Sequence, residues 1–508
     1  MLQAAEAATT FADMVWEAPF VGAPLIAGGW RLAADLVLPP VSGAADAWVI
    51  FAQADTLLAP SAQFIIKAQI AARPDIELFY ADDVALGEIG LDRKLGLKPA
   101  FDPALLIAAD YIGAPLIVRA AALERLGGPS AAASEAALYE MVLRASALGI
   151  PIGRIPYVLI AYPDKRPAIS AAARRQPART WAKTKGCDVV EGLKPGLLRL
   201  QKRFETYPSV TLVIPTRQSR RSGSARGRPL VLHLLDSLAQ TDWPMDRLNV
   251  LIGDDLPDAS IYQGVAWPFQ LRVTSTPRLE GAPFNYAAKM NTLWRQSETE
   301  HLVFMNDDVE ATSPGWLKAL LTFSTDSQVG GVGARLLYPN GAIQHAGIIG
   351  GLFGACAHAW LNQPADQPTY QDWAIVHKSW SIVTGAVFAT RRSAMEAVNG
   401  FDERFSLEFN DVDMCLRLGL AGYRIIYTPH AELRHEEKAS REEARPPGPD
   451  VALFLDRWRG WLADDPGYHP RLSRNSFVPH ATPRDDDWFS PRRLIKSPIP
   501  DGLPGVEP

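Results

Sequence analysis

The feature that most constrains the fold is an apolar run that stops abruptly in polar residues, LVFMNDD at residues 302–308. His301–Met305 has the β-branched and aromatic character of a buried strand, and the runs Val210–Pro215, Leu248–Gly253 and Gln270–Thr274 are similar. Because amphipathic, helix-like stretches separate these runs, the pattern predicts a largely parallel, doubly wound α/β sheet. Such sheets bind ligands at the carboxyl ends of their strands, where this chain carries acidic residues.

Length and charge limit the classes of protein that remain. The chain has 508 residues, 47% hydrophobic and 21% charged, which is globular composition and too long for one ordinary core, so we expect two domains. A formal net charge of −5, with both signs interspersed, excludes nucleic acid as the expected partner. The three cysteines, Cys187, Cys356 and Cys415, lack the paired spacing of a zinc site or a disulfide framework, which fits a reducing compartment.

The amino terminus does not resemble a signal peptide, because acidic Glu6 and Asp13 stand where a basic run and an apolar core would be needed. The most apolar window, Ala342–Leu361, contains His345, His358 and several glycines, which favours loops and buried strands over a membrane span. We therefore expect a cytoplasmic protein without a transmembrane segment. Peripheral association with the inner face of the cytoplasmic membrane stays open.

The carboxylates after residue 305 suit a divalent cation. Mg²⁺ and Mn²⁺ prefer oxygen ligands and commonly take one or two protein carboxylates together with substrate phosphates. Asp308 is the best ligand candidate. The alternative is that Asp307 and Asp308 only cap a helix that starts near Pro314.

Two further segments carry polar groups at expected ligand-binding positions. Asp254 and Asp255 end a second strand and could accept hydrogen bonds from a base or ribose, although in isolation the pattern favours a simple turn. The stretch 283–291 (PFNYAAKMN) brings Lys289 and amides to a helix start, where backbone N–H groups and a cation can hold a diphosphate.

Downstream, FNDVDMCLR at 409–417 places Asp411 and Asp413 at the start of an apolar helix. Complementarity to the helix dipole is one explanation. The other is that a carboxylate deprotonates an acceptor hydroxyl, as a general base. His435 follows the strand-like run Tyr423–Thr428, and either ligates a metal, donates to a phosphate or is structural.

Taken in order, these segments resemble the family 2 glycosyltransferases of bacterial O-antigen and exopolysaccharide assembly, which have the nucleotide-sugar-binding GT-A fold. The resemblance covers about 230 residues. It rests on the following segments: Val210–Arg217, Asp254, Phe284–Asn291, Asn306–Asp308, Leu336–Gly347, Gly400–Glu403, Phe409–Arg417 and His435–Glu436.

The resemblance implies a role for each candidate residue. Asp411 would be the catalytic base of an inverting single displacement, with Asp413 beside it, and Asp308 would bind Mg²⁺ or Mn²⁺ with His435 assisting at the donor diphosphate. The residues implied at the nucleotide-sugar site are Pro215, Thr216, Asp254, Asn285, Lys289, Asn306 and Asp307. Two departures from the family pattern stand out: Asn306 replaces the first aspartate of an Asp-X-Asp pair, and Asp255-Leu256 replaces a glycine-containing turn.

The amino-terminal half resembles the same family as a first, truncated copy. Residues 51–60 (FAQADTLLAP) match the strand and strand end at 301–308, which we call the metal strand. Tyr80–Asp83 and Lys98–Pro103 match the family segments that follow this strand. Gln53 and Leu138 stand at the positions of the metal-strand aspartate and the base, so we expect this copy to be inactive. We predict domains at residues 1–200 and 205–445, a basic join over Lys165–Lys202, a flexible loop over Ser219–Arg228 and a proline-rich, mostly irregular tail at 446–508.

The expected partners are a nucleotide-sugar donor and a growing glycan or lipid-linked glycan acceptor. A sugar nucleotidyltransferase is one alternative, although it would usually carry a glycine- and lysine-rich loop after the first strand. A non-catalytic glycan-binding or scaffold protein of a polysaccharide assembly complex is the other, since the first half has lost its chemistry.

Overall fold

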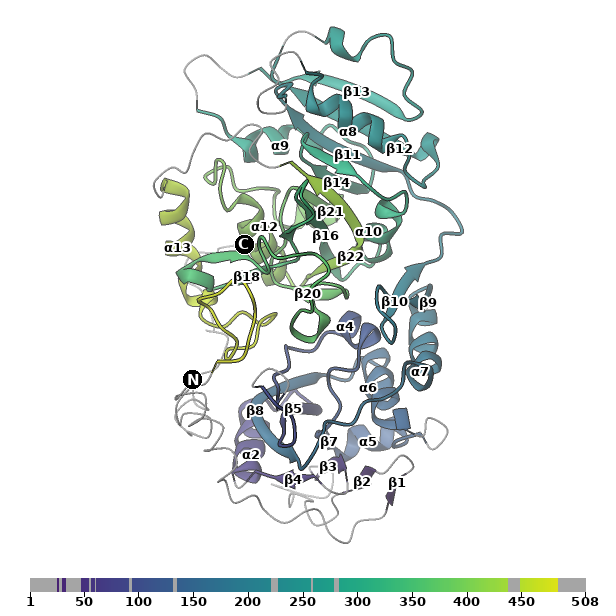
Figure 1. Cartoon of the computed structure of the whole chain (residues 1–508), viewed down its shortest axis with the longest axis vertical. Helices are drawn as coiled ribbons and strands as arrows, with labels where there is room; N and C mark the ends of the chain where they lie inside the picture. Colours follow the sequence, from purple (N-terminus) through teal and green to yellow (C-terminus); the bar gives the residue numbers. More distant parts are fainter. Residues whose placement is uncertain are drawn as a thin grey trace. The chain divides into compact units, whose positions relative to one another are not determined.

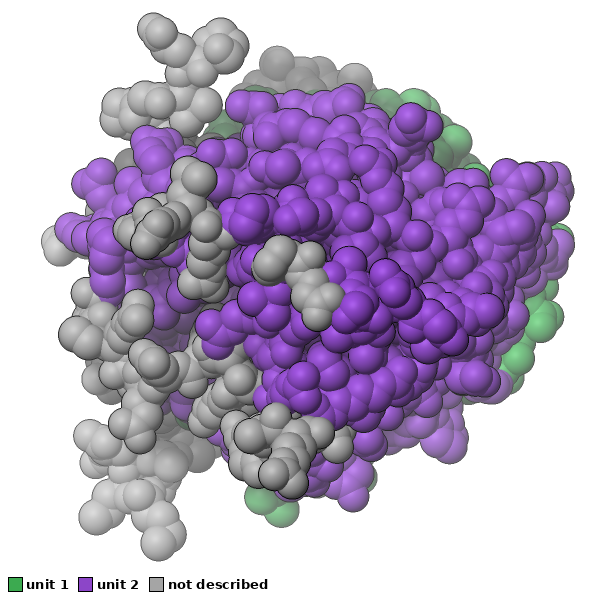
Figure 2. All heavy atoms as spheres, turned by 90° about the horizontal axis from the view of Figure 1, so that it is seen from above, with its two compact units in different colours: residues 1–184, 468–473, 480–508 green, residues 185–467, 474–479 purple. Residues whose placement is uncertain are grey.

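The computed structural model describes residues 25–26, 30–32, 47–53, 56–59, 61–90, 94–130, 135–220, 227–256, 259–277, 283–436 and 448–482. These residues form two compact units (Figures 1 and 2): unit 1 comprises 1–184, 468–473 and 480–508, and unit 2 comprises 185–467 and 474–479. The boundary between Thr184 and Lys185 falls inside the predicted join. Most of the predicted loop at Ser219–Arg228, positions 54, 55 and 60 of the amino-terminal match at 51–60, and the tail after 482 lie outside the described residues.

The first half of the unit 2 sheet has the parallel strands that the sequence predicts. They are β11 (Val210–Thr216), β12 (Leu248–Asp254), β13 (Gln270–Ser275) and β14 (His301–Met305). Their order is β13-β12-β11-β14, and every pair is parallel. Their carboxyl ends therefore meet at one edge of the sheet, as the prediction required.

The second half of this sheet is mixed, so the prediction of a largely parallel sheet is wrong there. The order continues β14-β21-β16-β22-β15, and of these pairs only β16–β22 is parallel. An apolar run shows that a strand is buried but not in which direction it runs. The strands are β15 (Val309–Ala311), β16 (Val329–Leu337), β21 (Val387–Arg391) and β22 (Arg424–His435), with β17 (Ile343–His345) beside β16 and β20 (Lys378–Trp380) beside β22.

Helices and two hairpins complete unit 2. The helices are α8 (Leu230–Leu238), α9 (Tyr286–Trp294), α10 (Trp316–Ser324), α11 (Arg392–Ala397), α12 (Asn410–Leu420) and α13 (Pro449–Leu462). The hairpins are β9 (Cys187–Glu191) with β10 (Leu198–Lys202), and β18 (Ile348–Gly350) with β19 (Cys356–His358). Within the tail that was expected to be mostly irregular, α13 is a 14-residue helix with Pro449 in its first turn, where proline is tolerated.

Unit 1 has its own mixed sheet, in the order β1-β2-β3-β7-β5-β8-β4, with β6 beside β5. Its strands are β1 (Leu25–Ile26), β2 (Trp30–Leu32), β3 (Trp48–Gln53), β4 (Leu57–Leu58), β5 (Leu78–Ala85), β6 (Leu95–Gly96), β7 (Leu116–Arg119) and β8 (Ile152–Tyr162). The helices are α2 (Ala62–Ala72), α4 (Pro103–Ala108), α5 (Ala120–Leu126), α6 (Ala137–Ala147) and α7 (Ala171–Thr184).

The two sheets share a pairing pattern. The order β3-β7-β5-β8-β4 in unit 1 corresponds strand for strand to β14-β21-β16-β22-β15 in unit 2, and each corresponding pair has the same direction. The central parallel pair of each sheet also shifts register at corresponding places, between Ala81 and Asp82 and between Ala334 and Arg335.

The apolar window at Ala342–Leu361 forms β17, β18, a short 3₁₀ turn and β19, as expected for loops and buried strands. Within the described part of the chain, no helix is long and apolar enough to cross a membrane.

Candidate active site

The ends of three neighbouring strands converge through direct hydrogen bonds. Thr216, the last residue of β11, pairs with Asp254 of β12 in the sheet register, and its hydroxyl donates to Asp307 Oδ2 at 2.6 Å just beyond β14. Pro215, one residue earlier, pairs with Gly253. The predicted residues Pro215, Thr216, Asp254 and Asp307 therefore lie together at one sheet edge.

Asp308 and His435 form a close carboxylate–imidazole pair. His435 Nε2 lies 3.0 Å from Asp308 Oδ1, and both side chains are at least nine-tenths buried. Strand pairing fixes this geometry, because β15 begins at Val309 opposite His435 and the Glu436 N–H donates to the Asp308 carbonyl. Asn306 Nδ2 lies 3.5 Å from the same imidazole nitrogen. The alternative that Asp307 and Asp308 cap a helix near Pro314 is wrong, because β15 intervenes and Gly315 is the N-cap of α10.

Asp307 differs from its neighbour in environment. Burial raises the pKa of Asp307 to about 7, while the hydrogen bond from Thr216 acts in the opposite direction and the charge of Asp308 adds to the rise. Two adjacent carboxylates at one strand end thus have different partners: Asp307 faces Thr216 of β11, and Asp308 faces His435 of β22.

Asp254 is only 1% exposed, and both of its oxygens already have partners. Oδ1 accepts from the Leu256 N–H at 3.0 Å, while Oδ2 accepts from Tyr262 at 2.7 Å and from the Gln218 amide at 2.9 Å. The turn interpretation of this segment is therefore correct for Oδ1. A nucleotide would reach Oδ2 only by displacing Gln218 or Tyr262.

Two residues predicted to lie at the donor diphosphate make internal contacts. Lys289 forms a buried ion pair with Asp255 at 2.5 Å and donates to the Thr216 carbonyl at 3.1 Å. Desolvation lowers the pKa of Lys289, against the opposing effect of the nearby carboxylates. Asn285 is the N-cap of α9, where its side chain accepts from the Ala288 N–H.

The loop before β21 links Asp411 to the metal strand. The Gly385 N–H donates to Asp411 Oδ2 at 2.6 Å, and the next carbonyl, that of Ala386, accepts from the Asn306 N–H at 3.0 Å. Oδ1 of Asp411 accepts from Val412 N–H at 2.8 Å. Asp411 is partly exposed and its carboxylate retains acceptor capacity on both oxygens.

Asp413 lies two residues further along α12 in a different environment. Its side chain is fully buried, and its oxygens accept from Arg417 at 2.7 Å, from Arg457 at 2.6 Å and from the Trp458 indole at 3.0 Å. These contacts suit a structural ion-pair cluster. Of the two carboxylates in α12, Asp411 is the one placed to meet a substrate.

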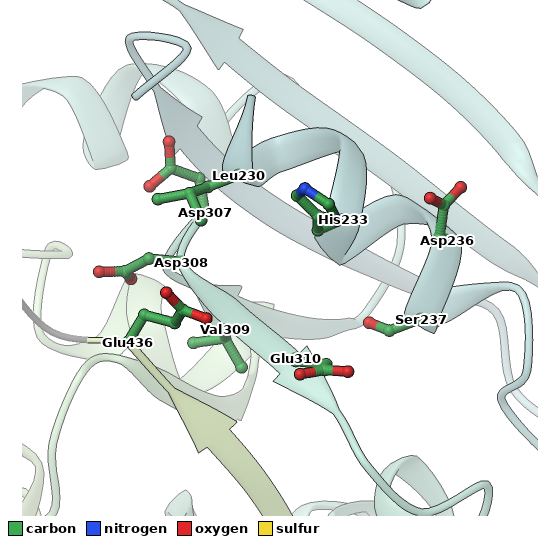
Figure 3. A pocket seen from close by; sticks show the side chains of 9 residues that line it. All are labelled: Leu230, His233, Asp236, Ser237, Asp307, Asp308, Val309, Glu310 and Glu436. Carbon is green, nitrogen blue, oxygen red and sulfur yellow. The ribbon is translucent and has the colours of Figure 1, made fainter. Parts of the chain in front are cut away.

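A cavity of about 300 Å³ opens beside the strand ends (Figure 3). Five carboxylates line it, and the described lining residues include no lysine or arginine. The full set is Leu230, His233, Asp236, Ser237, Asp307, Asp308, Val309, Glu310 and Glu436. The cavity is therefore strongly acidic.

Sequence reasoning missed several residues of this site. His233 and Asp236 come from α8, and nothing in the local pattern marks them. Gly385 and Ala386 act through backbone groups, so their residue types give no signal. The ion pair of Asp255 was also missed. Asp255 was considered as an acceptor for a base or ribose and as a departure from the family pattern, although an acid next to Asp254 and a lysine on the following helix could have suggested the pair.

Comparisons with known proteins show what the chain is similar to. Residues 208–446 match the family model described as "Glycosyltransferase like family 2". The O-antigen biosynthesis protein RfbC of Myxococcus xanthus is 29% identical over 448 residues, covering 84% of this chain and 34% of the relative. Protein y4gI of Sinorhizobium fredii is 30% identical over 467 residues, covering 86% of this chain and 50% of the relative. The chain thus spans half or less of the length of these two relatives.

A shorter match connects the chain to the N-acetylglucosaminyl-diphospho-decaprenol L-rhamnosyltransferase of Mycobacterium tuberculosis, 28% identical over 184 residues, 32% of this chain and 56% of the relative. Among solved structures, the mannosyltransferase PcManGT of Pyrobaculum calidifontis, in complex with GDP-Man and Mn²⁺, shares 17% identity and a TM-score of 0.33 over 64% of this chain and 82% of that one. S. aureus TarS 1-349, in complex with UDP-GlcNAc, shares 16% identity and a TM-score of 0.35 over 51% of this chain and 67% of that one.

The α/β sheet with its acidic strand ends, the family model and the named relatives point to the same class of domain. Residues 208–446 of the chain carry a glycosyltransferase family 2 domain.

Proposed function

We propose that this enzyme transfers a sugar from a nucleoside diphosphate donor to a hydroxyl group of a growing glycan, with inversion at the anomeric carbon. The observation that carries the proposal is the linkage of three groups at one sheet edge. Asp308 is paired with His435, and Asp411 is tied to the same strand end through the consecutive residues Gly385 and Ala386.

Asp308 and His435 fit a divalent cation, Mg²⁺ or Mn²⁺. Two neighbouring ligands of an octahedral ion, each at about 2.1 Å, stand about 3 Å apart, and Asp308 Oδ1 and His435 Nε2 are separated by 3.0 Å. In the described residues no group of three or more His, Cys, Asp or Glu side chains could hold a metal ion alone. That accords with an ion that takes its remaining ligands from phosphate and water.

The acidic cavity supports the same requirement. Arg228 and Arg434 pair with two of the five carboxylates, and the remaining acidic groups would repel a donor diphosphate unless a cation offset their charge. A divalent ion would supply that charge and stabilise the leaving diphosphate. Asn306 lies beside the pair and Thr216 contacts the neighbouring Asp307, and both would orient the donor there. Lys289 and Asp254 support the strand ends through their internal contacts.

Asp411 is the proposed general base. It would accept the proton of the acceptor hydroxyl while the hydroxyl oxygen bonds to the anomeric carbon and the bond to the diphosphate breaks on the opposite face. The N–H groups of Gly385 and Val412 hold the carboxylate in one orientation. A positioned base contributes about 10²–10⁴-fold in rate.

The acceptor class follows the named relatives. We propose that the acceptor is a glycan of the O-antigen or exopolysaccharide type, free or lipid-linked. We also propose that this protein is cytoplasmic and associates peripherally with the inner face of the membrane. We further propose that unit 1 is a truncated and inactive copy of the catalytic fold, because its strand order and directions repeat those of unit 2 from β14 onward.

The test is sugar transfer or donor hydrolysis by the full chain with Mn²⁺ and a panel of UDP-, GDP- and dTDP-sugars. We expect turnover of one donor class, reduced about 10²–10⁴-fold by Asp411→Asn. Asp246 is exposed, so Asp246→Asn is the matched control, and its rate of turnover should equal that of the wild type. Binding of a glycan without turnover would favour the scaffold function, and pyrophosphate release from a nucleoside triphosphate would favour the nucleotidyltransferase.

A further inference from the structure

Helix α13 begins at Pro449, beyond the end of the family match at residue 446, yet it contacts the segment that carries Asp411. The contacting residues are Asp450, Phe454, Arg457 and Trp458. Their spacing of four, seven and eight residues places them on one face of a helix. All belong to unit 2 together with α12.

The first contact holds the loop that precedes α12. The Asp450 carboxylate accepts from the backbone N–H groups of Leu407 and Glu408, each at 3.0 Å, and from the Ser406 hydroxyl at 3.3 Å. Asp450 is 6% exposed, so these bonds are shielded from water. One buried carboxylate thus fixes three consecutive residues of the loop.

The second contact supports an unfavourable backbone conformation. Phe409, the N-cap of α12, has φ of 59°, in the left-handed region. This region costs a residue with a side chain roughly 1–2 kcal/mol. The ring of Phe409 stacks on Phe454 with centroids 4.4 Å apart and an interplanar angle of 13°. Packing against α13 therefore offsets the backbone cost two residues before Asp411.

The third contact fixes α12 just after Asp411. Arg457 and the Trp458 indole both donate to Asp413 Oδ1, at 2.6 and 3.0 Å. Arg457 also donates to Asp402 at 2.8 Å. Phe409 and Asp413, which flank Asp411 in the chain, therefore both contact α13.

We propose that α13 is a positioning element that seats Asp411 against the Gly385 N–H, with Arg457 as its main positioning residue. The proposal rests on the proposed role of Asp411 as the base. Misplacement of a reacting group by about 1 Å costs on the order of 10²-fold in rate. Loss of the α13 contacts should therefore lower kcat while the donor site, formed by the strand ends, stays intact.

The test compares Arg457→Met with Arg459→Met in the full chain. Arg459 lies two residues away on the same helix and is exposed, so it controls for loss of an arginine from α13. Hydrogen–deuterium exchange of peptides covering 383–387 and 405–415 reports the seating of Asp411 without any substrate, and a peptide covering 301–308 reports the metal strand.

We expect faster exchange at 383–387 and 405–415 in Arg457→Met, unchanged exchange at 301–308 and wild-type exchange throughout in Arg459→Met. With the donor sugar that the wild type turns over, kcat should fall about 10- to 100-fold and the donor KM should stay within about twofold. Wild-type exchange and kcat in Arg457→Met would overturn the proposal. Equal loosening of all three peptides would also overturn it, because it would indicate a general structural role.

A second variant covers the case in which Arg457→Met does not fold. Phe454→Leu removes the ring stacking on Phe409, and Phe409→Gly in the same chain removes the backbone cost, because glycine adopts positive φ readily. We expect Phe454→Leu to lower kcat and the double variant to recover part of it. No loss in Phe454→Leu would contradict the proposal. An inactive wild type would instead refute the proposed function, and the exchange data would then still decide whether α13 orders residues 405–415.

Discussion

The Gly385 N–H donates to Oδ2 of Asp411 at 2.6 Å. This bond connects the start of α12 with the loop before β21, whose next residue, Ala386, accepts from the Asn306 N–H. Because Asn306 opens the polar strand end that contains Asp308, one dipeptide joins the proposed base to the proposed metal site. The position of the proposed base relative to the proposed metal site therefore depends on two backbone groups, the Gly385 N–H and the Ala386 carbonyl.

Substitution of Gly385 should disturb this connection without replacing a side chain of the site. A Cβ at position 385 would lie 3.1 Å from the Asp411 Cβ and 3.5 Å from its Oδ2, so the aspartate must shift by a few tenths of an ångström. We expect Gly385→Ala to lower kcat about tenfold, since small misplacements of reacting groups are costly, and to leave nucleotide affinity unchanged. Steady-state kinetics and nucleotide titration measure the two effects.

Gly419→Ala is the matched control for that variant. Gly419 lies in α12, the helix that carries Asp411, and a Cβ at this glycine would meet nothing within 4 Å. Its kcat should equal that of the wild type. Equal kcat values for both alanine variants would contradict the role assigned to the Gly385–Asp411 bond.

The Lys289–Asp255 pair should contribute mainly to stability. Lys289→Met removes the cation that pairs with Asp255, whose side chain is 8% exposed, and breaking a buried pair costs about 3–5 kcal/mol. Chemical denaturation should show that loss. In Lys318→Met, whose partner Asp242 is 64% exposed, the loss should be below about 1 kcal/mol. Weaker nucleotide binding by Lys289→Met at unchanged stability would instead show that the lysine holds the diphosphate.

The parallel strands of unit 2 could be predicted from the sequence, because buried strands such as β11, β12 and β14 leave a local signature. The four runs predicted between residues 210 and 305 match β11 to β14 within two residues at each end. The start of α12 was also predictable, since Asp411 and Asp413 precede an apolar helical pattern.

Other features depend on partners that are distant in sequence. The direction of β21 and β22 follows from long connections, which apolar runs do not encode. The local sequence does not distinguish Asp411 from Asp413. Only Asp413 is fully buried, by Arg457 and Trp458, which lie more than 40 residues later in the chain. Local patterns thus located the candidate site but could not assign roles within it.

Acid should destabilise the catalytic unit through its buried histidines. Burial, and secondly the charge of Arg199, lowers the pKa of His430 to about 3, whereas an unfolded histidine titrates near 6.5. Below about pH 6.5 the unfolded chain binds a proton that the folded chain does not, so stability falls as pH decreases toward 3.

This histidine alone should lower the free energy of unfolding by about 1–2 kcal/mol at pH 5 relative to pH 7.5. Urea denaturation of the wild type and of His430→Asn at both pH values measures the effect, and the variant should lose less stability between them. The same pH dependence in both proteins would show that His430 titrates normally in the folded state.

The proposed transfer reaction depends above all on Asp308, which with His435 would hold a divalent cation at the donor diphosphate. The decisive experiment is isothermal titration of the purified chain with UDP, GDP and dTDP, each with and without Mn²⁺, for the wild type and Asp308→Asn. We predict that one nucleotide binds only when the metal is present and that Asp308→Asn abolishes this binding. Nucleotide binding that depends on neither the metal nor Asp308, or no binding by the wild type under any of these conditions, would contradict the proposed metal site.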